Sequence, residues 1–111
     1  MNQQMPGLYP LELSHTLLMR DYLSRYPREN CDYTITNLIV WGKIYNNQYT
    51  IWKDSLVFFN PKHQYIYFPL GEGFTPKDLQ SLVLLFRQYY PTSELILIPS
   101  EYLTQHPDMY T

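Results

Sequence analysis

The residues best suited to bind a ligand lie in one loop, Leu70-Gly71-Glu72-Gly73-Phe74-Thr75. The loop follows a predicted strand and precedes a predicted helix, and its two glycines would let backbone amides approach a ligand closely. Gly71 and Gly73 are therefore the candidate cofactor-binding residues. Glu72 would repel a phosphate, and the loop matches neither the Walker nor the dinucleotide-binding glycine pattern. Glycines that only serve a turn are the more ordinary interpretation.

The other reactive side chains suggest no catalytic constellation. His15, His63 and His106 are far apart in the chain, and none belongs to a pair with metal-ligand spacing. Cys31 lies beside Asp32 without a histidine near it in sequence, so an inert thiol is the simpler interpretation. We expect no catalytic residue and no metal site in this chain.

Composition predicts one folded domain over residues 1–111. The chain is 45% hydrophobic and only 16% charged, which is typical of a packed globule and not of disorder. The formal charge of −2 disfavours binding to nucleic-acid backbones or anionic lipid. A single cysteine fits a reducing compartment, and no segment has the pattern of a signal peptide or a membrane span. We expect a cytoplasmic protein.

The first half of the chain predicts one short strand and two helices. A strand over residues 8–13 contains Pro10, which confines it to an edge. Ser14 is a suitable N-cap for a helix that Pro27 would end. Residues 33–45 are ambiguous because their β-branched residues favour a strand, but apolar residues at helical spacing favour a second helix.

The second half predicts a three-stranded antiparallel meander over residues 48–52, 55–60 and 65–70, joined by turn-like connections. A helix follows, with a capping box formed by Thr75 and Asp78 and with Pro76 at its first position. Its apolar stripe consists of Leu79, Leu82, Val83, Phe86 and Tyr90.

The last predicted elements are a strand over residues 94–99 and a short helix from Ser100. Leu-Ile-Leu-Ile in this strand is typical of a strand buried on both faces in a parallel pairing. The complete order is β-α-α-β-β-β-α-β-α, which predicts the α+β class with a mixed sheet.

Three segments carry a resemblance to a known family. They are Tyr-Leu-Ser-Arg-Tyr-Pro at 22–27, Asn-Cys-Asp-Tyr-Thr-Ile-Thr-Asn-Leu-Ile-Val-Trp at 30–41 and Phe-Pro-Leu-Gly-Glu-Gly at 68–73. The chain resembles the bacterial phosphatidylglycerol lysyltransferase C-terminal-like family from about Leu11 to Pro107. That family consists of two tandem acetyltransferase-like (GNAT) halves, and this chain is similar to the first half alone.

The resemblance implies a GNAT-like half that lacks the last strands of a complete GNAT sheet, so residues 95–99 would form an open edge. A second GNAT-like half or a homo-oligomer mate is the partner it implies. It also places residues 71–75 where GNAT domains hold the pyrophosphate of acetyl-CoA. Pro69 and Leu70 stand where such loops begin with Arg or Gln.

Three functions remain open. The first is a non-catalytic or substrate-positioning N-terminal domain of an aminoacyl (lysyl)transferase-like protein, in which the motif Asp32, Thr36, Asn37 and Trp41 locks the second helix. In such relatives the transfer machinery belongs mainly to the second half, including a basic Lys-Arg-Asn segment absent here. The second is a small oligomeric protein-interaction module. The third is a minimal acyltransferase that binds acetyl-CoA or another acyl-CoA through Gly71 and Gly73.

Overall fold

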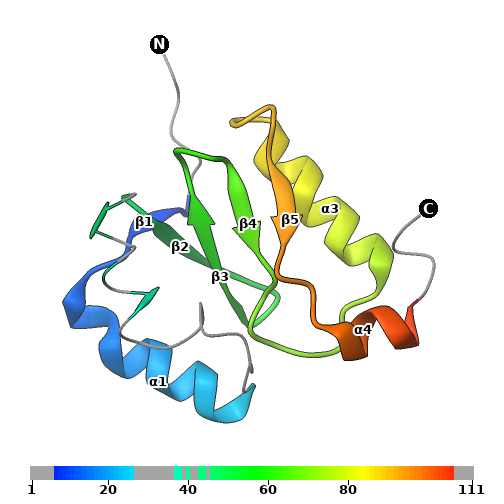
Figure 1. Ribbon diagram of the computed structural model, residues 1–111, viewed down its shortest axis with the longest axis horizontal. Helices are drawn as coiled ribbons and strands as arrows, with labels where there is room; N and C mark the ends of the chain where they lie inside the picture. Colours follow the sequence, from blue (N-terminus) through cyan, green and yellow to red (C-terminus); the bar gives the residue numbers. More distant parts are fainter. Residues whose placement is uncertain (1–6, 27–36, 39, 41–42, 45, 107–111) are drawn as a thin grey trace.

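The protein is a small α+β structure built on a five-stranded mixed sheet (Figure 1). The computed structural model describes residues 7–26, 37, 38, 40, 43, 44 and 46–106. The strands are β1 (Tyr9–Pro10), β2 (Gln48–Trp52), β3 (Ser55–Asn60), β4 (Tyr65–Tyr67) and β5 (Glu94–Ile96). The helices are the short 3-10 turn η1 (Leu13–His15), α1 (Thr16–Arg25), α3 (Pro76–Arg87) and α4 (Ser100–Gln105).

The sheet has the order β1-β2-β3-β4-β5, and only its last pairing is parallel. The predicted antiparallel meander is confirmed, and β2 and β3 have the predicted bounds. A two-residue turn, Lys53-Asp54, connects β2 to β3. Both residues adopt positive φ (49° and 60°), which suits a tight hairpin loop of this length. The parallel pairing predicted for residues 94–99 is also confirmed.

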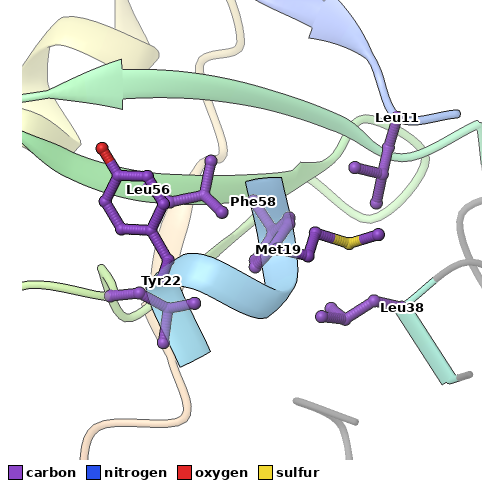
Figure 2. Close-up of a cluster of buried hydrophobic side chains, with 7 residues drawn as sticks. Leu11, Met19, Tyr22, Leu38, Leu56 and Phe58 are labelled. Carbon is purple, nitrogen blue, oxygen red and sulfur yellow. The ribbon is translucent and has the colours of Figure 1, made fainter. Parts of the chain in front are cut away.

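Every residue of β3 is buried, because α1 packs on one face of the sheet and α3 on the other. Leu56 and Phe58 belong to the α1-side core, shown in Figure 2, where Met19 and Tyr22 of α1 lie against them. The alternate residues Val57 and Phe59 belong to the α3-side core. The members of the α1-side core are Leu11, Met19, Tyr22, Leu38, Leu56, Phe58 and Leu70, and those of the α3-side core are Leu8, Val57, Phe59, Ile66, Leu82 and Phe86.

Strand β4 is shorter than the predicted 65–70 because a β-bulge follows Tyr67. Ile66 lies opposite Phe59, and Leu70 lies opposite Leu56. The chain therefore advances four residues from Ile66 to Leu70 while β3 advances three, which leaves one extra residue in the bulge. The buried Pro69 lies within this bulge, which is one of the few sheet positions that tolerate proline.

Strand β5 is also shorter than predicted and is not buried on both faces. It ends at Ile96 because Leu97 adopts a left-handed φ of 61°, which turns the chain out of the sheet. Glu94 is exposed and Leu95 is half-buried, as expected of a strand at the edge of the sheet. The predicted burial on both faces was therefore wrong.

The start of α1 differs from the prediction as well. Ser14 lies inside η1, and His15 takes the N-cap position without a side-chain hydrogen bond to the helix. Instead, the His15 Nδ1 atom accepts a hydrogen bond from the Glu12 amide (3.0 Å). The predicted Ser14 cap was wrong, whereas the helix ends before Pro27 as expected, at Arg25.

The predicted second helix lies mostly outside the described residues. Asn37, Leu38, Val40, Lys43 and Ile44 are described and are helical, and Leu38 is buried in the α1-side core. Of the family-like motif, Asp32, Thr36 and Trp41 lie outside the described residues, as does Cys31.

Candidate functional site

The candidate loop, residues 70–75, connects the bulged end of β4 to the first turn of α3. In Figure 1 it runs beneath the sheet, near the point where β5 leads into α4. The C-terminal ends of a parallel strand pair and the N-termini of two helices therefore meet in one region. In open α/β sheets, such a region is where ligands commonly bind.

Gly71 packs closely against the sheet. A Cβ atom there would overlap the Ser55 hydroxyl and would lie 2.7 Å from Ser55 Cβ and 2.9 Å from Phe74 Cζ. Gly73 has a different constraint, a φ of +81° with open space around the Cβ position. Each glycine thus has a structural reason of its own, either close packing or a left-handed turn.

The predicted capping box at the start of α3 is present in full. The Asp78 amide donates to Thr75 Oγ1 (3.1 Å), and the Thr75 amide donates to Asp78 Oδ2 (3.0 Å). Pro76 has no amide hydrogen, so these two bonds use two of the amides that an anion would need. The hydrogen bond from the Thr75 amide, followed by that from Lys53, holds the pKa of Asp78 below its ordinary value.

Lys53 extends this network from the β2–β3 turn. Its Nζ atom lies 3.3 Å from Asp78 Oδ1 and 5.8 Å from the ring centroid of Trp52. The carboxylate of Asp78 therefore occupies the positive end of α3, and Lys53 balances its charge. A phosphate approaching the loop would meet this carboxylate and that of the exposed Glu72.

Aromatic side chains pack against the loop and against one another. Phe74 stacks on Trp52 (ring centroids 5.4 Å apart), while Phe68 meets Tyr102 of α4 edge to face (5.0 Å). The Tyr102 hydroxyl donates to the Phe74 carbonyl (3.0 Å). Burial and then the nearby Asp78 charge raise the pKa of Tyr102. We call Trp52, Phe68, Phe74 and Tyr102 the aromatic cluster.

The histidines remain separate in the fold. His15 packs edge to face on Tyr49, His63 stacks on Tyr65 in a turn, and His106 lies against Tyr102 at the end of α4. Because His15 Nδ1 accepts from an amide, the neutral ring carries its proton on Nε2, which faces the Tyr49 hydroxyl (3.3 Å). Among the described residues, no group of three metal-ligating side chains occurs.

The loop is evident from the sequence, but the residues that surround it are not. Ser55, Lys53 and Tyr102 come from a strand, a turn and a helix that are distant from the loop in sequence, and only the turn residues Lys53 and Asp54 had a local signal. The sequence does not indicate that Ser55 would face Gly71.

The β5 edge is the second notable feature. The Glu94 amide donates to Gln64 O (3.1 Å) and the Phe68 amide donates to Ile96 O (3.0 Å), so Glu94 and Ile96 direct their backbone groups toward β4. In a parallel ladder the intervening Leu95 must direct its N–H and C=O to the opposite side. Within the described part of the chain no strand lies on that side.

Comparisons with known proteins identify no relative: no family model, no curated protein and no solved structure matches the chain. Among the described helices, none is long and apolar enough to cross a membrane.

Proposed function

We propose that this chain is a non-catalytic, GNAT-like domain of an aminoacyltransferase-like protein, and that it acts by extending its sheet through β5 into a second domain of the same fold. The second domain would supply the transfer chemistry, while this one would hold the assembly together or position the substrate.

The element order supports the GNAT-like part of the proposal. A meander leads into a capped helix, and the strand after that helix returns parallel to β4. The candidate cofactor loop supports the non-catalytic part. Asp78 occupies the N-terminus of α3, Gly71 is packed against Ser55, and the aromatic cluster packs against the loop.

The β5 edge is the observation that carries the proposal. Within the described residues no strand pairs with the Leu95 amide and carbonyl, and β5 contains no proline or lysine that would prevent another strand from pairing. The opposite edge strand, β1, spans only two residues and includes Pro10. Pairing at β5 would satisfy the Leu95 backbone groups and cover the half-buried Ile96 side chain.

Acetyl-CoA binding tests the non-catalytic part. A ligand that binds the native state must raise the melting temperature in proportion to its affinity. We expect no rise when acetyl-CoA is added at millimolar concentration. A rise that Gly73→Glu abolishes would instead support the acyltransferase alternative.

Self-association tests the β5 edge, with a second copy of the chain as the available domain of the same fold. We expect light scattering to show an oligomer whose population grows with protein concentration and which Ile96→Lys dissociates. The melting temperatures of the two proteins should be equal in dilute samples, where both are monomeric. Ile51→Lys is the matched control because Ile51 is an exposed isoleucine on β2, beyond the residues paired with β1. A monomer at every concentration, or dissociation by Ile51→Lys alone, would contradict the proposal.

A further inference from the structure

Helix α4 is attached to the rest of the fold much more weakly than α3. None of its six residues is buried, and Pro99 at its N-cap makes no side-chain hydrogen bond to it. Helix α3 has three buried residues and a complete capping box. A six-residue helix is also far too short to be stable alone in water. Its contacts with the protein must therefore keep α4 folded.

Tyr102 supplies the principal contact. Its ring packs against Phe68, and its hydroxyl donates to the Phe74 carbonyl, so one side chain links α4 both to the segment that follows β4 and to the candidate loop. Phe68 and Phe74 are only 3% and 7% exposed in this arrangement. Tyr102 packs on the group that contains both rings, so loss of its contact would leave that group more exposed to water.

The connection between β5 and α4 has the features of a hinge. Leu97 is a bulky residue with a φ of 61°, a conformation that is costly outside glycine and asparagine. Its side chain packs on the α1-side core, whereas Ile98 packs on the group containing Phe68 and Phe74. The chain thus changes direction at Leu97, between a firmly held strand and a weakly held helix.

We propose that α4 is a hinged strap with Tyr102 as its latch. The strap opens as a unit about residues 97–99 and exposes Phe68 and Phe74, while the sheet, α1 and α3 stay folded. Opening uncovers the region where the C-terminal ends of β4 and β5 meet the candidate loop. This device is independent of the β5 pairing proposed above, because the Leu95 edge is present whether α4 is open or closed.

Native-state hydrogen exchange in low urea tests the strap. The Leu103 and His106 amides donate to Pro99 and Tyr102 within α4, whereas the Leu56 amide lies in the centre of the sheet. We expect the two α4 amides to share one opening free energy, well below that of Leu56, and one urea dependence that is measurable but smaller than that of Leu56, because opening exposes only part of the buried surface. If all three exchange with the same free energy and the same urea dependence, α4 opens only by global unfolding and the proposal fails.

Tyr102→Phe tests the latch, because it removes the hydroxyl and keeps the ring. Losing one neutral hydrogen bond should raise the opening constant at Leu103 and His106 by roughly fivefold and leave that at Leu56 unchanged. Tyr89→Phe is the matched control, since Tyr89 packs on the α3-side core. Simple fraying would give Leu103 and His106 unrelated exchange rates that Tyr102→Phe does not change, and that result would overturn the proposal.

Discussion

Gly71→Ala distinguishes a glycine required by packing from a glycine reserved for a ligand. The new Cβ would overlap the Ser55 hydroxyl and would lie within 3 Å of Ser55 Cβ and Phe74 Cζ. Ser55 is 1% exposed and Phe74 is 7% exposed, so neither side chain can move into solvent. Overpacking of this kind costs typically 1–3 kcal/mol, and we expect a loss of about 2 kcal/mol in the free energy of unfolding.

Two further variants identify the origin of that loss. Gly73→Ala has no steric conflict, so only its φ of +81° opposes it, at a cost of about 1 kcal/mol. Ser55→Gly removes the hydroxyl and the Cβ that Gly71→Ala would strike. The double variant of Ser55 and Gly71 should therefore be more stable than the sum of the two single effects predicts, by at least about 1 kcal/mol.

Urea unfolding followed by far-ultraviolet circular dichroism gives all four free energies. If Gly71→Ala lies within about 0.5 kcal/mol of the parent chain, a typical result for a surface substitution, the contact with Ser55 is not what requires glycine. Strict additivity of the Ser55 and Gly71 variants would also refute the packing explanation. A destabilised Gly71→Ala that Ser55→Gly rescues would support it.

Three more predictions concern caps and titrating groups. Thr75→Ala should lower the free energy of unfolding by about 1 kcal/mol while Thr75→Ser stays close to the parent, which urea unfolding measures. The pKa of Asp78 is lowered in the folded state, so its contribution to stability is present above the unfolded pKa and is lost as the pH falls through the folded pKa. Asp78→Asn should therefore flatten this part of a plot of the urea midpoint against pH. An unchanged plot would contradict the role given to Asp78. His15→Phe should cost about 1 kcal/mol because Glu12 loses its acceptor, whereas His15→Asn should cost less, and equal losses in thermal unfolding would exclude that role.

Elements that are defined by residues close together in the sequence could be predicted from the sequence. Strands β2 and β3 have the predicted bounds because the Lys53-Asp54 turn separates two runs of apolar and β-branched residues. The capping box was predictable because Thr75 and Asp78 are three residues apart, and the two hydrogen bonds follow from that spacing.

Non-local contacts determine what the sequence did not indicate. Strand β4 stops early because a bulge at Pro69 shifts its register against β3, and a proline alone does not specify a bulge. Strand β5 stops early because Leu97 adopts positive φ, which a leucine does not signal. His15 takes the N-cap position in place of Ser14 because the 3-10 turn η1 ends at His15 and α1 begins only at Thr16.

The candidate site shows the same division. Gly71 and Gly73 were identified from the loop sequence, but their surroundings depend on Ser55 and Tyr102, which the fold brings from residues before and after the loop. A pair of glycines has the same sequence signature whether it approaches a ligand or a neighbouring side chain.

The most direct test of the proposed role compares two neighbouring amides of β5 in a dilute, monomeric sample. Leu95 and Ile96 are adjacent and half-buried, but only Ile96 directs its amide toward β4. We predict fast hydrogen exchange at Leu95 and strong protection at Ile96, with Leu95 becoming protected when the chain associates. Protection of Leu95 in the monomer would contradict an edge available for a second domain.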